Sequence, residues 1–142
     1  MQVLVDTSVW SLALRRAPAS VLKAAVPANQ QAAVTALRDL IADGRACLLG
    51  AVRQELLCGI KSATQFETLR AALTGFEDVA LMQTDYELAA DFFNTCRAKG
   101  IQGSNTDFLI CAAASTRKLP ILTTDQDFVL YSKYLSINLY PF

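Results

Sequence analysis

Short apolar runs alternate along the chain with longer stretches in which apolar residues recur every three or four positions. The runs at 3–5, 46–49, 79–81 and 121–122 have the length and continuous apolarity of buried parallel strands. The stretches between them have the spacing of helices that bury one face. This alternation predicts an α/β fold, a three-layer α/β/α sandwich with a mainly parallel central sheet.

Six helices are expected around these strands. Their starts fall at or near Ser8, Asn29, Ala51, Phe66, Thr84 and Ser104. The segment Thr84–Glu87 has the pattern of a capping box, and Gly44 and Gly100 are typical helix stops. Residues 16–28 are expected to form a long connection, and the alternating residues 136–139 a final edge strand.

Composition limits the classes of protein that fit. With 142 residues, 53% of them hydrophobic, residues 1–142 can form a single domain with its own core. Lys+Arg and Asp+Glu both number 13, so no global positive field attracts nucleic acid or a membrane. No uncharged apolar stretch approaches the roughly 18 residues of a membrane span, and no signal-peptide pattern opens the chain. We therefore expect a soluble cytoplasmic protein with no membrane partner.

Cysteine and histidine content narrows the possible chemistry. The four cysteines are far apart and apolar residues surround each, which favours free buried thiols in a reducing compartment. The chain has no histidine, which excludes every Ser–His or Cys–His dyad. A structural zinc site is unfavoured for the same reason. Any catalysis has to use carboxylates, lysine or a bound metal ion.

Four acidic residues stand in apolar surroundings, where unpaired carboxylates are rare. Asp6 and Asp125 each follow a predicted strand, while Glu55 and Asp107 lie in the first turns of predicted helices. The remaining acids look like solvated surface residues: Asp39, Asp43, Glu67, Glu77, Asp78, Asp85, Glu87 and Asp91.

Each of the four acids also has a simpler explanation. Asp6 can cap the helix that follows it, and Asp125 a short final helix. Asp107 stands three residues after Ser104, the spacing of a capping box. Glu55 can be an ordinary surface residue, although it has no evident local partner.

Taken together, the four acids favour a metal site. The carboxyl ends of parallel strands, and the helix starts that follow them, meet at one edge of the sheet. Carboxylates gathered there repel one another unless a divalent cation lies between them. Mg²⁺ or Mn²⁺ suits a site made only of oxygen ligands, and such sites hydrolyse phosphodiester bonds by activating water. This chemistry explains a nuclease without histidine.

Four motifs resemble those of the PIN-domain family, and most closely its VapC ribonuclease toxins. They are V-L-V-D-T-S at 3–8, R-Q-E-L-L-C-G-I around Glu55, D-F-L-I-C-A-A-A from Asp107, and L-T-T-D-Q-D-F at 122–128. Residues 16–33 match no fixed feature of the family. The resemblance implies a PIN-like fold and a Mg²⁺- or Mn²⁺-dependent endoribonuclease. It also implies a homodimer that a cognate antitoxin inhibits by laying its C-terminal segment across the active site.

The resemblance also assigns roles to the acids. By position, Asp6, Glu55 and Asp107 match the three acidic metal-site residues of the family, and Asp125 matches its more variable fourth acid. All four are therefore predicted to be catalytic metal ligands. Asp127 matches the acid before the aromatic residue of the last motif.

Polar and basic residues complete the predicted site. Ser8 and Thr123 match residues that often line it. Because no helix is strongly basic, we nominate Arg53, Lys61 and Arg70 to hold RNA phosphates; ordinary solvated charge is the simpler explanation for each.

Two other functions compete with the nuclease. A phosphatase of the haloacid-dehalogenase type also places a nucleophilic Asp after its first strand, but it carries another Asp two residues later, where this chain has Ser8. The second alternative is a PIN-like module that only binds proteins and has lost its chemistry.

Overall fold

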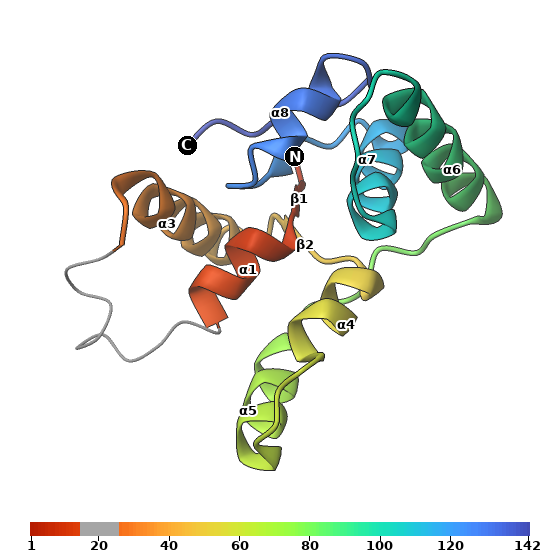
Figure 1. Ribbon diagram of the computed structural model, residues 1–142. Coiled ribbons are helices and arrows are strands. Elements are labelled where there is room, and N and C mark those ends of the chain that lie inside the picture. The colour runs from red at the N-terminus through yellow and green to blue at the C-terminus, as the bar shows by residue number, and fades with distance from the viewer. Residues whose placement is uncertain (15–25) are drawn as a thin grey trace.

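The computed structural model describes residues 1–14 and 26–142 (Figure 1). Its sheet has the parallel strands β1 (Val3–Val5), β2 (Ala46–Cys47) and β3 (Ile121–Leu122), in the order β2-β1-β3. The central strand β1 is fully buried, each of its three side chains being 0% exposed. A continuous apolar run is what a strand covered on both faces requires, so the predictions of parallel strands at 3–5 and 121–122 are confirmed.

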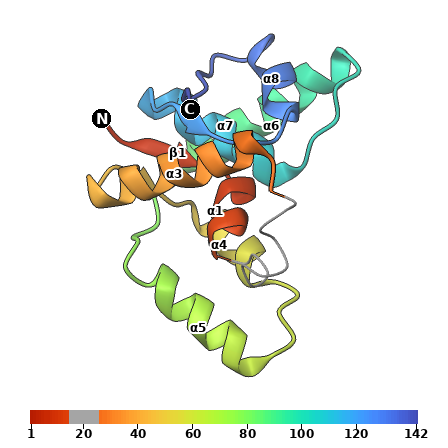
Figure 2. The same ribbon diagram turned by 90° about the vertical axis from the view of Figure 1, so that its left-hand side faces the viewer.

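Helices cover both faces of this sheet. Figures 1 and 2 show β1 between α1 and α3 on one side and α6 and α7 on the other, which confirms the predicted three-layer α/β fold. The helices are α1 (Thr7–Leu14), α3 (Ala28–Ala42), α4 (Gly50–Leu57), α5 (Ala63–Leu73), α6 (Gln83–Ala98), α7 (Asn105–Arg117) and α8 (Asp127–Ser132). Most of the connection expected over 16–28 lies outside the described residues.

Two predicted strands are absent from the described structure. These are the strands predicted over 79–81 and 136–139. An isolated parallel bridge joins Leu48 to Asp78, just before the first, and another joins Ile121 to Leu139, within the second. The backbone N–H of Val79 donates to the Leu48 carbonyl at 2.9 Å. The chain then leaves the sheet towards α6, so the apolar run at 79–81 does not continue the pairing.

Asp85 is not the surface residue that the helical pattern predicts, because it is only 1% exposed. Its carboxylate accepts hydrogen bonds from both terminal nitrogens of Arg117, at 2.8 and 2.9 Å, and from the backbone N–H of Met82 at 2.8 Å. The bond to Met82 caps α6, which begins at Gln83, so the capping box predicted from Thr84 is wrong. Asp85 and Arg117 instead clamp the start of α6 to the end of α7.

Three of the four cysteines are free and buried as predicted: Cys47, Cys96 and Cys111. Burial raises the pKa of each of these thiols, which keeps them protonated and unreactive. Cys58 differs from the prediction. It is exposed, because it follows the last residue of α4.

None of the helices in the described part of the chain combines the length and apolar character needed to cross a bilayer.

Candidate active site

Asp6 is the first residue after β1, and the sheet fixes its position. Its backbone N–H donates to the Leu122 carbonyl at 2.9 Å, which ties it to the end of β3. The side chain is only 4% exposed. Oδ2 accepts hydrogen bonds from the hydroxyls of Ser8 and Thr123, both at 2.8 Å. The predicted neighbours of Asp6 therefore lie against it, and they use one carboxylate oxygen.

The environment of Asp6 disfavours its negative charge. Burial raises the pKa of this carboxyl. The hydrogen bonds from Thr123 and Ser8 lower the pKa by less than burial raises it, so the net shift is upward. A helix cap in solvent would have no such desolvation. The carboxylate of Asp6 is therefore poorly compensated by the chain itself.

Asp107 has two roles in the first turn of α7. Its backbone N–H donates to the Ser104 hydroxyl at 3.0 Å, so the predicted cap at Ser104 is present. Its half-buried carboxylate, however, accepts a hydrogen bond from the Tyr131 hydroxyl at 2.7 Å. Burial raises the pKa of Asp107, and the charges of Asp6 and Asp125 raise it further. Capping thus explains the backbone of Asp107 but not its carboxylate.

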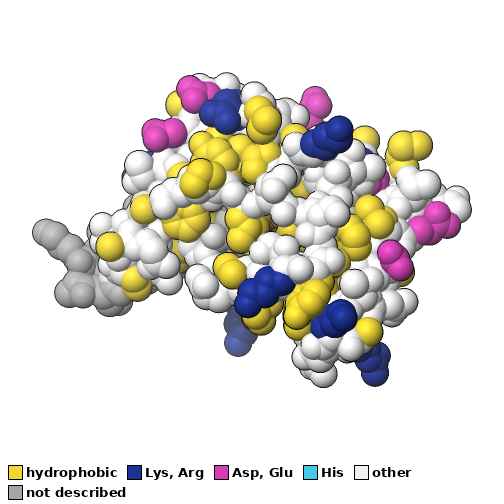
Figure 3. Space-filling view, turned by 90° about the horizontal axis from the view of Figure 1, so that it is seen from above, with side chains coloured by type: hydrophobic (Ala, Val, Ile, Leu, Met, Phe, Trp, Pro, Cys, Tyr) yellow, Lys and Arg dark blue, Asp and Glu magenta, His cyan; other side chains and the backbone are white. Residues whose placement is uncertain are grey.

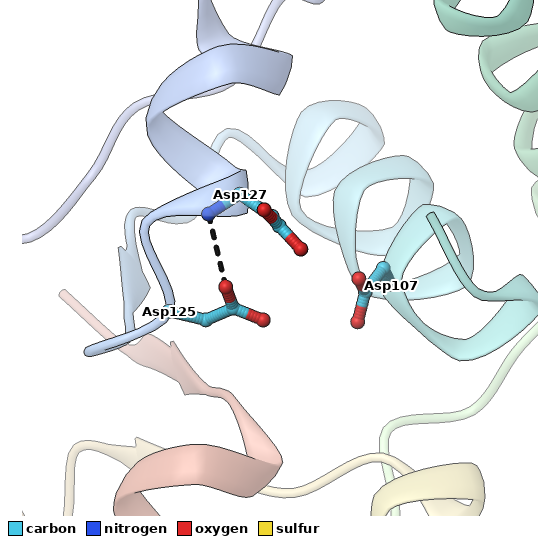
Figure 4. A group of neighbouring side chains, drawn as sticks. All are labelled: Asp107, Asp125 and Asp127. Atoms are coloured by element: carbon cyan, nitrogen blue, oxygen red, sulfur yellow. Dashed lines mark hydrogen bonds between the residues drawn. The ribbon is translucent and has the colours of Figure 1, made fainter. Parts of the chain in front are cut away.

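The turn after β3 adds two more acids. The backbone N–H of Asp125 donates to Thr123 Oγ1 at 3.0 Å, and that of Asp127 donates to Asp125 Oδ1 at 2.9 Å. One carboxylate oxygen from each of Asp107, Asp125 and Asp127 lies within 4.8 Å of the other two. Figure 4 shows these three side chains facing a common space between α7 and the start of α8.

Glu55 lies at the border of this site. It is exposed on α4, and its Oε1 accepts a hydrogen bond from the Thr7 hydroxyl at 3.2 Å. Thr7 directly follows Asp6, so the bond brings the start of α1 and the middle of α4 together. Its exposure matches the surface explanation, whereas its bond to Thr7 places it next to the residue that follows Asp6. Glu55 is not part of the group formed by Asp107, Asp125 and Asp127.

The chain supplies these acids with no counter-charge among its described residues. The ion pairs found there join Arg53 to Asp78, Arg70 to Glu67 and Arg117 to Asp85. None involves Asp6, Asp107, Asp125 or Asp127. A set of carboxylate and hydroxyl oxygens without basic partners or sulfur ligands fits a hard divalent cation such as Mg²⁺ or Mn²⁺.

Of the basic residues nominated for RNA phosphates, Arg53 forms hydrogen bonds within the chain instead. Its guanidinium donates to Asp78 at 2.9 Å, to the Leu73 carbonyl at 2.9 Å and to the Phe76 carbonyl. It therefore fastens α4 to the chain segment after α5 and has a structural role.

The other two nominees are exposed. Arg70 pairs with Glu67 within α5, whereas Lys61 lies in the turn between α4 and α5. On the face seen in Figure 3, Lys and Arg side chains stand apart from one another and form no single basic patch.

Sequence reasoning missed one residue of the site, Tyr131. It lies four positions after Asp127 in α8, where an aromatic residue is typical of any core-facing helix. Its only signal is the hydroxyl, since a buried tyrosine needs a hydrogen-bond partner.

The fold and the acidic edge define an α/β protein with a group of acidic side chains at the carboxyl ends of its strands. The model of the PIN domain family matches residues 3–134, and the chain belongs to this family. Members of the family are generally nucleases. Seven chains of solved structures match, among them the crystal structure of FitAcB from Neisseria gonorrhoeae. It superposes with a TM-score of 0.70 over 99% of this chain and 97% of that chain, at 17% sequence identity, and so shares the fold. No curated protein matches the sequence.

Proposed function

We propose that this PIN domain is a Mg²⁺- or Mn²⁺-dependent endoribonuclease and the toxin of a toxin–antitoxin pair. The observation that supports the proposal best is the group formed by Asp107, Asp125 and Asp127, with Asp6 close enough for its charge to raise the pKa of Asp107. None of these acids has a basic partner among the described residues. A protein gains nothing in stability from neighbouring carboxylates that repel one another. Their arrangement is explained if they hold a cation.

The residues of the chain divide the work between them. Asp6, Asp107 and Asp125 would hold the ion, with Asp127 beside them and Glu55 at the border. Ser8 and Thr123 fix the orientation of Asp6 through Oδ2, and so leave Oδ1 as a ligand. A bound divalent ion supplies Lewis acidity, which lowers the pKa of water and offsets the charge of the phosphodiester.

RNA, the antitoxin and a second copy of the chain are the proposed partners, and the cytoplasm is the proposed location. The motif resemblance to VapC toxins supports all four. Lys61 is proposed as a phosphate contact, because it is exposed and has no ion pair within the described residues. Membership of the PIN family sets the haloacid-dehalogenase alternative aside. A PIN domain kept for protein binding alone remains the competing function.

The test is RNA cleavage by purified protein in Mg²⁺ or Mn²⁺, compared with Asp107→Asn. Loss of one ligand carboxylate should lower the cleavage rate by at least about 100-fold, as expected when electrostatic stabilisation is removed. Asp91→Asn is the matched control, since Asp91 is an exposed acid of α6, and it should cleave like the wild type. A wild-type protein that binds Mn²⁺ in calorimetry but cleaves no RNA would contradict the ribonuclease. One that binds no Mn²⁺ would favour the protein-binding module.

A further inference from the structure

Tyr131 is the aromatic residue that connects the core to the acidic site. It projects from α8 and its side chain is 0% exposed. The ring packs against Phe108 and Phe128, with centroid separations of 4.9 and 5.2 Å. Only the hydroxyl reaches the site, where it donates to Asp107 Oδ2 at 2.7 Å. A ring held on two sides by other aromatic rings gives this donor a fixed position.

Gly103 leaves the space that the hydroxyl occupies. A Cβ atom at this position would lie 2.2 Å from the Tyr131 hydroxyl oxygen and 2.9 Å from Cε2 of Phe108. Positive φ angles are found at other glycines, not at Gly103. The absence of a side chain at Gly103 is therefore required by the rings of Tyr131 and Phe108 rather than by the backbone conformation.

The phenol of Tyr131 suits a donor, because it carries one O–H. That O–H is directed at Asp107 Oδ2, with an O···O distance of 2.7 Å. The bond fixes the rotation of the Asp107 carboxylate and leaves Oδ1 outside it.

We propose that Tyr131 is a positioning residue that orients the Asp107 carboxylate for a divalent cation, and that Gly103 keeps the space for its hydroxyl. The inference rests on the proposed function, because it assigns Asp107 to the metal site. Hydrogen bonds from a second layer of residues hold metal-ligating carboxylates in their binding orientation, and their loss typically costs 10- to 100-fold in metal affinity or activity.

Tyr131→Phe tests this directly, because it removes the hydroxyl and keeps the ring. Calorimetric titration of purified Tyr131→Phe with Mn²⁺ should give a Kd at least about tenfold above that of the wild type. RNA cleavage at low Mn²⁺ should fall with it and recover in part when Mn²⁺ is raised. Tyr134→Phe is the matched control. Tyr134 lies three residues after Tyr131 and is 47% exposed. Removing its hydroxyl should leave the Mn²⁺ Kd unchanged.

A second variant tests the space that Gly103 leaves. Gly103→Ala should displace the hydroxyl and raise the Mn²⁺ Kd, with little further increase when it is combined with Tyr131→Phe. An unchanged or tighter Kd in folded Tyr131→Phe would overturn the inference. If the wild type itself binds no Mn²⁺, the proposed function fails instead. If the wild type binds Mn²⁺ and Tyr131→Phe behaves like Tyr134→Phe, only the positioning role fails.

Discussion

At the residue scale, Asp6 shows what the acidic site costs the protein without a cation. The carboxylate is almost fully buried, and the three hydrogen bonds it receives from Ser8 and Thr123 all go to one oxygen. Neutral hydroxyl and amide donors compensate a buried charge less well than an ion does. Removing the charge while keeping the shape should therefore stabilise the metal-free protein.

Asp6→Asn is the variant that tests this cost. In EDTA at pH 7 its melting temperature should lie about 2–4 °C above that of the wild type, the change that about 1 kcal/mol produces in a domain of this size. Trp10, the one tryptophan of the chain, is fully buried and reports unfolding by its fluorescence. In saturating Mn²⁺ the wild type should instead have the higher melting temperature, because only the wild type keeps all the proposed ligands.

The pH dependence of this difference follows from the direction of the pKa shift. The pKa of Asp6 is raised above its usual value of 3.8 in the folded protein, so the folded state binds the proton more tightly than the unfolded state. The wild type therefore gains stability as the pH falls from 7 through the raised pKa. The advantage of Asp6→Asn should shrink over that range, and an advantage that grows would contradict the desolvation of Asp6.

Single residues also show where sequence reasoning ends. Asp6 and Asp125 were predictable, because each directly follows a short apolar strand and parallel strands share one edge. Asp85 was not, because its partner Arg117 lies 32 residues later and helical periodicity gives no sign of that pairing. The role of Tyr131 was not predictable for a related reason. Its hydroxyl matters only through the contact with Asp107, which arises when α7 and α8 pack together.

At the scale of elements, a polar clamp of Asp85 and Arg117 joins α6 to α7. Arg117 bridges Asp85 and the Ala80 carbonyl, and so joins the end of α7 to the start of α6. The guanidinium lowers the pKa of Asp85 to about 2. A pKa below the usual 3.8 means that this contribution is present above about pH 4 and lost as the pH falls towards 2.

Arg117→Gln should therefore destabilise the protein by about 3 kcal/mol at pH 7, because it leaves the carboxylate of Asp85 buried and unpaired. Denaturant unfolding followed by Trp10 fluorescence measures the change. Arg97→Gln, at an exposed position of α6, is the control and should change the free energy of unfolding by less than about 0.5 kcal/mol. If the two variants lose equal free energy of unfolding, the clamp does not act through Asp85. The same conclusion holds if the destabilisation of Arg117→Gln persists at pH 2.

Helices were easier to predict than strands in this chain. The six expected helices are present, since each has enough turns for an apolar stripe to be visible in the sequence. The strands have two or three residues, and a run that short gives no periodicity. Whether such a run pairs is decided by its neighbours, as 79–81 shows: the bridge to Leu48 is at Asp78, before the run, and the run itself leads towards α6. The sequence predicts the short helix α8 only as the element that Asp125 caps, and the Asp127 N–H does donate to Asp125 Oδ1.

At the scale of the whole molecule, the charge distribution gives the proposed cation a second role. The formal net charge is zero, and on the face seen in Figure 3 the basic side chains are dispersed. RNA that approaches the acidic edge thus meets a negative field from Asp6, Asp107, Asp125 and Asp127. A divalent ion in the site would neutralise that field at the point where the phosphate has to come closest.

The most direct test of the cation site is the anomalous scattering of crystals soaked in Mn²⁺. We predict a peak at ligand distance, roughly 2 Å, from carboxylate oxygens of Asp6 and Asp107, next to Asp125. The same soak of Asp107→Asn crystals should show a weaker peak or none. Absence of Mn²⁺ from this edge in the wild type, with the ion bound elsewhere or nowhere, would contradict the proposal that these acids exist to hold a metal.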